Sequence, residues 1–290
     1  MVELKARFDE EQNINWAEEL ERAGVNVVYG FAGLKIHAKL CLVVRREPKG
    51  MRRYAHIGTG NYNASSAKIY TDLGLFTARD DICSDVQDLF NVMTGFGVID
   101  NYRRIFVSPN HLRANITRLI REEAEIHRAK GGGRIIMKCN QLVDQGIVRE
   151  LYEASRAGVK IECVVRGICS LRPGIKNVSE TISVHSIVGE LLEHARIYYF
   201  EHGGEPVMYV GSADMMTRNL NGRIEVLTPV LDKKLMDNIL KQIVNPQLAD
   251  NTHAWELLSD GSYKKIKREA GVAAMDSQSH IKRVLNLLKR

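Results

Sequence analysis

The sequence has no hydrophobic run that approaches the roughly 20 apolar residues needed to cross a bilayer. Its first six residues also lack the pattern of a signal peptide. Its five cysteines form an odd set without a C-x-x-C pair, so neither a disulfide framework nor a cysteine zinc site is indicated. We therefore expect a cytoplasmic protein with reduced and mostly buried thiols at Cys41, Cys83, Cys139, Cys163 and Cys169.

The composition excludes a largely disordered chain, since 44% of the 290 residues are hydrophobic and 26% are charged. A chain of this length is typical of two domains, each able to bury its own core. The formal net charge of +6 suits a polyanionic partner such as polyphosphate, nucleotide or nucleic acid, but charge alone does not identify one.

One short constellation of polar residues occurs twice. Each copy has a histidine two residues before a cation, then a run of small residues that ends in Asn or Asp, and then a carboxylate. The copies are His37-Ala38-Lys39, Gly58-Thr59-Gly60-Asn61 and Asp72, and His194-Ala195-Arg196, Gly211-Ser212-Ala213-Asp214 and Glu225. The matched spacing indicates an internal repeat, in which the two histidines could face each other across a pseudo-two-fold axis.

The hydrophobic pattern predicts two α/β units. In the first, we expect strands and helices in the order strand, helix, strand, hairpin and helix, over residues 2–8, 10–23, 25–29, 37–58 and 84–94. The second begins near Phe106, with helices over residues 111–130 and 143–157, strands over 134–138 and 159–165, and a closing helix within 259–290. We place the domains at residues 1–105 and 106–290.

The repeat also predicts that the first domain is incomplete at its start. Arg7 precedes His37 at nearly the distance at which Arg166 precedes His194. The second unit has a strand and helices before Arg166, whereas only six residues precede Arg7. We therefore expect the chain to begin inside its first domain.

Two facing histidines suit phosphoryl transfer. A histidine nucleophile forms a phosphoramidate that keeps a high transfer potential, and a second histidine can protonate or deprotonate the departing or attacking oxygen. We assign these roles to His37 and His194. Phosphate oxygens would be held by Lys39, Asn61 and Arg196, and braced by the planar guanidinium groups of Arg7 and Arg166.

Three carboxylates would support this site. Asp72 and Glu225 are expected to accept a hydrogen bond from the unreactive ring nitrogen of a histidine and so to fix its tautomer. Asp214 is expected beside them. Simpler interpretations stay open: Asn61 and Asp214 could cap local backbone, Tyr70 could be an ordinary strand aromatic, and Arg7 and Arg166 could form plain salt bridges.

The paired histidine motifs resemble those of the phospholipase D superfamily, and the surrounding sequence is closer still to the polyphosphate kinase family. The segments that carry the resemblance are Val2-Glu3-Leu4-Lys5-Ala6-Arg7-Phe8-Asp9-Glu10, Gly33-Leu34-Lys35-Ile36-His37-Ala38-Lys39, Gly58-Thr59-Gly60-Asn61-Tyr62-Asn63, Tyr70-Thr71-Asp72, Val165-Arg166-Gly167, Leu192-Glu193-His194 and Gly211-Ser212-Ala213-Asp214. Together they cover nearly the whole chain.

The resemblance implies two phospholipase D-like domains related by pseudo-two-fold symmetry, each a mixed sheet flanked by helices, from the carboxy-terminal part of the enzyme. It further implies that ATP phosphorylates His37, that His194 assists, and that Tyr70, Arg166 and His194 contact the nucleotide. Arg7 matches a position near Mg²⁺, although an arginine is better suited to holding phosphates around the ion than to binding it. Met215 departs from the pattern, because a tryptophan is expected there, and Arg196 replaces the lysine of the superfamily motif.

The implied partners are ATP or ADP and inorganic polyphosphate, without nucleic acid. The full-length enzyme is expected to be a homo-oligomer, and peripheral attachment to the inner membrane is compatible with the resemblance. Two alternatives remain at this point: a phosphodiesterase of the same fold, either nuclease or phospholipase, and a catalytically silent module that binds polyphosphate or nucleotide.

Overall fold

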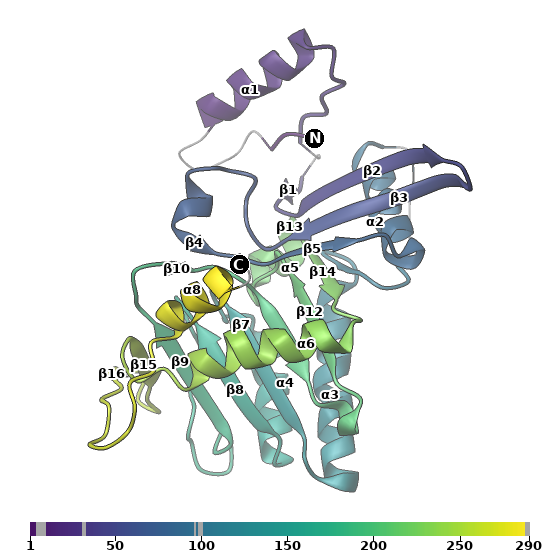
Figure 1. Ribbon diagram of the computed structural model, residues 1–290. Coiled ribbons are helices and arrows are strands. Elements are labelled where there is room, and N and C mark those ends of the chain that lie inside the picture. The colour runs from purple at the N-terminus through teal and green to yellow at the C-terminus, as the bar shows by residue number, and fades with distance from the viewer. Residues whose placement is uncertain (4–9, 31–32, 96, 98–100, 288–290) are drawn as a thin grey trace.

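The computed structural model describes all residues except 4–9, 31–32, 96, 98–100 and 288–290. The chain forms a mixed α/β fold with a large sheet in its second half and a small sheet in its first (Figure 1). Arg7 and most of the predicted strand over residues 2–8 lie outside the described residues. Among the helices that the structure describes, none is long and apolar enough to span a membrane.

The second half is built on a nine-stranded mixed sheet in the order β16-β15-β9-β8-β7-β11-β12-β14-β6. Its three central strands β7, β8 and β9 run parallel, and all other neighbours are antiparallel. The strands are β6 (Phe106–Val107), β7 (Arg134–Cys139), β8 (Lys160–Val165), β9 (Ile182–Ile187), β11 (Ile197–Phe200), β12 (Val207–Gly211), β14 (Val226–Pro229), β15 (Ala254–Leu257) and β16 (Tyr263–Lys265).

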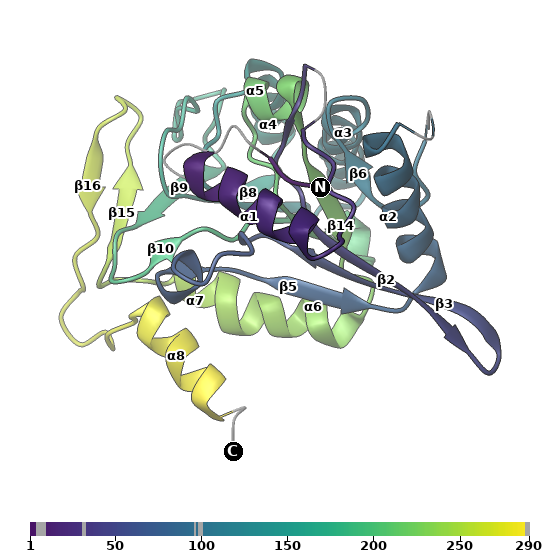
Figure 2. The ribbon, with the colours of Figure 1, turned by 90° about the horizontal axis from the view of Figure 1, so that it is seen from above.

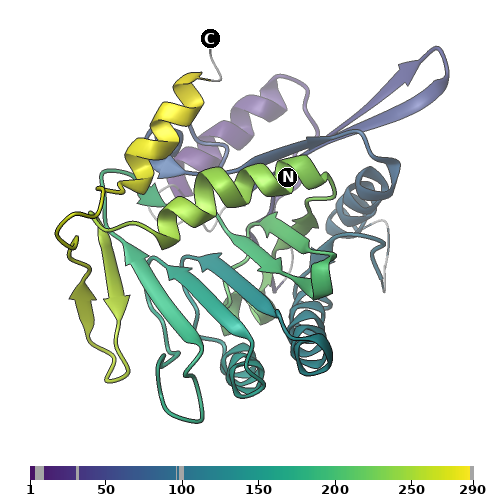
Figure 3. The same cartoon turned by 60° about the horizontal axis from the view of Figure 1, so that its bottom comes forward.

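Helices cover both faces of this sheet, as the near-continuous burial of its central strands requires. The helices α3 (Leu112–Lys130) and α4 (Gln145–Arg156) lie on one face, and α6 (Lys233–Ile239) lies across the other (Figure 3). Side chains of β7 alternate between the two cores, since Ile135 packs with α3 and α4 while Ile136 packs with α6. After α6 the chain continues through a π-helical segment, α7 and α8 (Leu240–Val244, Asn245–Leu248 and Ser277–Leu287).

The first half contains a three-stranded antiparallel sheet, β2-β3-β5 (Lys39–Glu47, Gly50–Gly58 and Gly74–Thr77). The hairpin of β2 and β3 was predicted from its Pro48-Lys49-Gly50 turn, and it projects from the body of the protein (Figure 2). The helix α2 (Asp80–Met93) packs its apolar side on one face of this sheet. The opposite face is open, and Phe76 there is 81% exposed.

Two sequence predictions need correction in this half. The helix α1 (Glu10–Arg22) forms where it was predicted, but residues 25–29 form no strand, because in the described chain only Tyr29 bridges Val2. The predicted strand from His37 is broken, since β1 (Lys35–Ile36) ends before it and β2 begins after it. The single bridge from Val2 to Tyr29 is parallel, with α1 between the two residues, whereas a full parallel pair forms in the second half, where α4 connects β7 to β8.

The two halves are joined by two short parallel pairings that mirror each other. The strand β1 pairs with β13 (Arg223–Ile224), and β4 (Tyr70–Thr71) pairs with β10 (Leu192–Glu193). The backbone N–H of Ala38 donates to Ile224 and that of Ala195 donates to Thr71, at 3.0 and 2.9 Å. The pairings have the reciprocal pattern expected of a pseudo-two-fold axis, and each ends at a polar residue of the repeated constellation.

The short helix α5 (Thr217–Gly222) precedes β13, and two 3₁₀ turns lie at Ser66–Lys68 and His202–Gly204.

Candidate active site

Each histidine of the repeat lies against a carboxylate from the other half of the chain. The register Ile36 to Ile224 sets His37 beside Glu225, and the register Glu193 to Thr71 sets His194 beside Asp72. The structure therefore brings both histidines and both predicted carboxylates together, with the partners exchanged between the halves.

His37 is held by a buried carboxylate. Its Nδ1 lies 2.9 Å from Oε2 of Glu225, whose side chain is inaccessible to solvent, while the imidazole itself is 22% exposed. The other carboxylate oxygen of Glu225 accepts a hydrogen bond from Nδ2 of Asn219 at 2.7 Å. This second contact fixes the carboxylate. Two buried residues, Glu225 and Asn219, therefore set the orientation of the His37 ring.

The environment makes His37 a free base at neutral pH. Burial lowers the pKa of His37 to about 4, against the opposing effect of Glu225, and the nearby cations Lys39 and Arg196 lower it further. Burial alone would raise the pKa of Glu225, but its contacts with His37 and Lys39 lower it. An ionised carboxylate only accepts, so Nδ1 carries the proton and Nε2 keeps a lone pair. Nε2 is therefore the nucleophilic atom.

His194 has the same arrangement on the other side. Its Nδ1 lies 2.8 Å from Oδ1 of Asp72, which also accepts a hydrogen bond from Oγ1 of Thr59 at 2.6 Å. Burial lowers the pKa of His194, while the hydrogen bond to Asp72 raises it. Gly60 allows the close approach of this carboxylate, because a Cβ at Gly60 would lie 2.4 Å from Oδ2 of Asp72.

Two buried cations lie beside the histidines. Nζ of Lys39 donates to the backbone carbonyl of His37, and burial lowers the pKa of Lys39 to about 7. Nη1 of Arg196 is 3.1 Å from Nε2 of His194, and the same guanidinium pairs with Asp214 at 3.1 Å. Because Arg196 and Lys39 lower the pKa of both His37 and His194, the four side chains form one cluster.

Asp214 is not a local cap. Its carboxylate accepts a hydrogen bond from the backbone N–H of Asn140 at 2.7 Å and holds Arg196 in place. Although burial would raise the pKa of Asp214, its pairing with Arg196 lowers it. Asp214 therefore connects Arg196 to the end of the central strand β7.

The remaining predicted ligands surround the cluster at different depths. Arg166 is half-buried and donates from Nε to Oδ1 of Asn140 at 2.9 Å, and Nδ2 of Asn140 donates to the carbonyl of His194 at 3.3 Å. The ring of Tyr70 lies 4.7 Å from the ring of His194. Asn61 follows β3 and is exposed. Arg7 lies outside the described residues.

Several residues at the site were not identified from the sequence. Asn140, Asn219 and Thr59 orient its charged groups, and Arg223 places Nη1 3.9 Å from Oε1 of Glu225. The strongest missed feature is Glu193, the residue before His194, which forms a buried ion pair with Lys138 at 2.7 Å. Position next to a predicted catalytic residue was the available signal for Glu193, whereas Asn140 is marked only by its place after a buried strand.

Glu193 supports the His194 side through a buried network. Its carboxylate accepts hydrogen bonds from Thr71, Gln247 and Gln278 as well as from Lys138. Thr71 also contacts the backbone N–H of His194 at 3.3 Å. Met215, where a tryptophan was expected, is fully buried in the core under the sheet and its carbonyl accepts from the backbone of Val143.

The described residues contain no group of three or more His, Cys, Asp or Glu side chains that could hold a metal ion. The three carboxylates at the cluster, Asp72, Asp214 and Glu225, are each engaged by a histidine or an arginine. The surplus of cations instead suits phosphate oxygens.

Comparison with known proteins agrees with the sequence resemblance. Residues 105–278 match the family model "Polyphosphate kinase C-terminal domain 2", and residues 1–99 match "Polyphosphate kinase C-terminal domain 1". The chain is 52% identical over 270 residues to polyphosphate kinase 1 of Chlorobaculum tepidum and 52% identical over 280 residues to polyphosphate kinase of Synechocystis. These alignments cover 93% and 96% of this chain, but the chain spans only 38% of the length of either relative.

The fold agrees with a solved structure as well. The crystal structure of polyphosphate kinase from Porphyromonas gingivalis superposes with a TM-score of 0.90 at 36% identity. The match covers 99% of this chain and 44% of that one. The arrangement of both halves is therefore shared with that protein.

Proposed function

Because the chain belongs to the polyphosphate kinase family, we propose that it carries the reaction centre that moves the terminal phosphate of ATP reversibly to inorganic polyphosphate, through a phosphohistidine at His37. The observation that supports this most directly is the exchanged pairing of His37 with Glu225 and of His194 with Asp72. It provides two imidazoles whose pKa values are both lowered and whose Nδ1 protons are fixed by carboxylates.

In the first half-reaction, Nε2 of His37 attacks the γ-phosphorus of ATP. A P–N bond forms, the bond to the β,γ-bridging oxygen breaks, and ADP leaves with that electron pair. The Nδ1 proton of His37 stays on the ring and its hydrogen bond to Glu225 stabilises the positive charge that develops there. Lys39 and Arg196 offset the charge on the equatorial oxygens.

In the second half-reaction, a terminal oxygen of polyphosphate attacks the same phosphorus. The P–N bond breaks, its electrons return to Nε2 of His37, and the chain is one phosphate longer. His194 serves the oxygen that enters or leaves, by taking or giving a proton at Nε2. Arg196 lies 3.1 Å from this atom, so it must turn toward the phosphate before His194 can be protonated.

The outer residues would bind the substrates. Tyr70 lies beside the His194 ring and can pack against the nucleotide, and Arg166 can direct its terminal guanidinium nitrogens to phosphate. Asn61 is exposed near the same edge and can donate its amide N–H groups. Asp72, Asp214 and Glu225 act through the side chains that they orient.

Mg²⁺ would enter as the complex of the nucleotide phosphates, because Asp72, Asp214 and Glu225 are already engaged by a histidine or an arginine. Arg7 would then hold phosphates around the ion. We also propose the domain division at residues 1–105 and 106–290, since the site draws one histidine and one carboxylate from each part. Cytoplasmic location, homo-oligomers of the full-length enzyme and peripheral attachment to the inner membrane rest on the resemblance alone.

The proposal is tested by incubating the chain with ATP labelled at the γ-phosphate. We expect acid-labile, alkali-stable label on His37 and ATP-dependent lengthening of polyphosphate. A chain that cleaves bis-p-nitrophenyl phosphate and takes no label would instead be a phosphodiesterase. Binding of polyphosphate with neither reaction would identify a silent binding module. Label that survives acid but is lost in alkali would show a serine or threonine ester and exclude phosphohistidine.

A further inference from the structure

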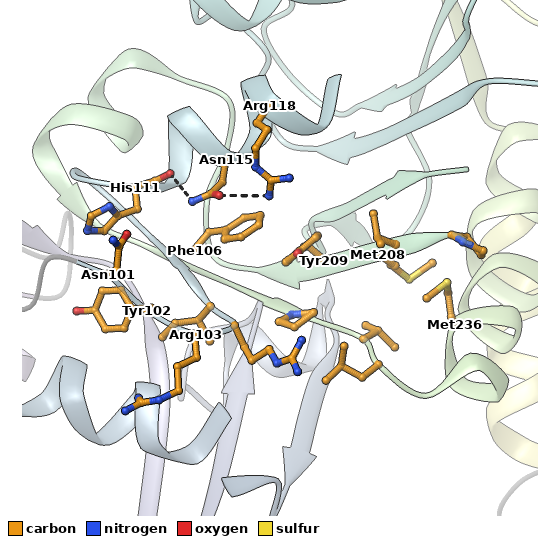
Figure 4. A pocket seen from close by; sticks show the side chains of 17 residues that line it. Asn101, Tyr102, Arg103, Phe106, His111, Asn115, Arg118, Met208, Tyr209 and Met236 are labelled. Atoms are coloured by element: carbon orange, nitrogen blue, oxygen red, sulfur yellow. Dashed lines mark hydrogen bonds between the residues drawn. The ribbon is translucent and has the colours of Figure 1, made fainter. Parts of the chain in front are cut away.

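A pocket is lined by residues at the start of β12 and at the end of β14 (Figure 4). Glu225 precedes β14 at the candidate active site, whereas Pro229 ends this strand and lines the pocket. Four residues of extended strand place the two ends about 13 Å apart. The pocket has a volume of about 380 Å³, which falls in the range of small-molecule sites.

The polar part of this pocket is cationic. Arg103, Arg104 and Arg118 line it, together with His111, and no carboxylate belongs to the described residues that form its wall. Among the described residues, the Arg104 side chain donates only from Nε, to Asp81. Both of its terminal nitrogens are therefore available to a ligand. The Arg104 and Arg118 side chains are 47% and 51% exposed, so the ion pairs that they make are weak and can be exchanged for a ligand.

Two of these cations and one hydroxyl line the pocket from three segments: Arg104 precedes β6, Arg118 lies on α3 and Tyr209 lies on β12. Arg118 donates to Glu122 at 2.8 Å, so a ligand would exchange with that carboxylate. Burial raises the pKa of Tyr209, while Arg118 and Arg104 lower it and Glu122 raises it. A phosphate at this point could accept hydrogen bonds from two planar forks and from the Tyr209 hydroxyl.

The rest of the wall is aromatic and apolar. Phe106 and Tyr209 stack with ring centroids 4.3 Å apart, and Tyr102 meets His111 edge to face at 6.1 Å. Nε2 of His111 is buried and has no hydrogen-bond partner among the described residues. A buried ring nitrogen without a partner is unfavourable, and a bound ring would satisfy it once the His111 side chain turns toward the pocket.

We propose that this pocket binds a nucleoside phosphate, at a site separate from the histidines. Arg104, Arg118 and Tyr209 hold the phosphate, and the base lies near Tyr102 and His111. A lone phosphate would fill only a small part of the volume and would leave the aromatic part of the wall without a ligand. The combination of a cationic end with an aromatic end therefore selects a nucleotide over a simple anion.

The test measures binding of adenylyl imidodiphosphate to the 290-residue chain by calorimetry and maps the site by amide hydrogen exchange. We expect protection at residues 101–118, 206–209 and 229–231. Arg104→Gln with Arg118→Gln should weaken this binding by roughly tenfold or more, because two charge-assisted hydrogen bonds are lost. The matched control is Arg128→Gln with Lys130→Gln, two exposed cations at the other end of α3, which should leave it unchanged.

Further measurements identify the class of ligand and distinguish loss of the site from misfolding of a variant. His37→Ala should keep the protection at the pocket, since that site does not use His37. Tripolyphosphate and orthophosphate should give clearly weaker protection than the nucleotide. Equal protection by tripolyphosphate would overturn the nucleotide assignment, and unchanged exchange at these three segments in the unmodified chain would overturn the site itself.

Discussion

Glu225 is 188 residues away from His37 in sequence, yet its carboxylate lies 2.9 Å from the Nδ1 atom of that histidine. Asp72 makes the same contact with His194 across 122 residues. The two contacts result from backbone pairing of β1 with β13 and of β10 with β4. Each half of the chain thus controls the protonation of the histidine in the other half.

Glu225→Gln should reduce phosphorylation of His37 by about 10²-fold to 10⁴-fold, as the wrong tautomer does in serine proteases. The glutamine amide can donate to Nδ1, which would move the ring proton to Nε2 and remove the attacking lone pair. The rate of labelling by γ-labelled ATP measures the effect. Asp72→Asn is the matched control, since it should leave labelling largely intact and slow transfer to polyphosphate. Equal effects of both changes on labelling would contradict the exchanged assignment.

His37→Ala should abolish the phosphoenzyme, because only His37 forms a covalent bond to the transferred phosphate. His194→Ala should still allow some labelling, with slower transfer to polyphosphate. Single-turnover experiments with ATP, followed by addition of polyphosphate, separate the two steps. Labelling that needs His194 and persists without His37 would reverse the two roles.

On the acid side, the rate of the labelling step should fall only as the pH approaches 4. The reason is that burial lowers the pKa of His37 to about 4, and the ring attacks only when it is unprotonated. Lys39 acts in the opposite direction: its pKa is lowered to about 7, so its charge is present below pH 7 and is lost as the pH rises through that value.

ATP binding should accordingly weaken above pH 7, visible as a rise of KM. Lys39→Arg provides the control for this alkaline effect, because an arginine keeps its charge. A profile in which KM rises equally in Lys39→Arg would assign the alkaline effect to another group.

Lys138→Met should lower the free energy of unfolding by about 3 to 5 kcal/mol, because it leaves the buried Glu193 carboxylate without its cation. Adding Glu193→Gln should restore part of the loss, since the unpaired charge is then removed. Chemical denaturation measures both. The control is Arg22→Gln, which breaks an ion pair whose side chains are 77% and 53% exposed and should change stability by less than about 1 kcal/mol.

Phe76→Ser should make the isolated chain less prone to self-association. The side chain is 81% exposed on the face of the β2-β3-β5 sheet that α2 leaves open, beside Val43 at 50%. Large exposed apolar side chains on a sheet favour association. Sedimentation velocity over a range of protein concentrations tests this, with Tyr263→Ser, at 39% exposure on β16, as the comparison. Identical concentration dependence for both variants and the parent would contradict the expectation.

The repeat in the sequence predicted that two histidines and two carboxylates would pair, because equivalent residues of two similar units can meet across one axis. It could not predict which carboxylate meets which histidine. Asp72 and Glu225 are spaced alike within their own halves, and only the backbone pairing between the halves decides the contacts. The β2-β3 hairpin was predictable from its local turn, whereas residues 25–29 had strand-like side chains but pair in the described chain only at Tyr29.

The buried ion pair of Lys138 and Glu193 could not be predicted from the sequence, for a different reason. Lys138 lies in an apolar strand, where one lysine is usually taken for a residue that reaches solvent. Here its side chain is 2% exposed, and only the tertiary structure supplies the carboxylate that it needs.

The exchanged contacts have a consequence for how such a protein can change over time. A substitution at Asp72 acts first on His194, and one at Glu225 acts first on His37, so neither half can alter its own chemistry independently. If the halves were produced as two polypeptides, neither would contain a correctly protonated histidine until the other docked. The reactivity of each histidine thus depends on both halves of the chain. Substitutions in one half are constrained by the residues of the other half.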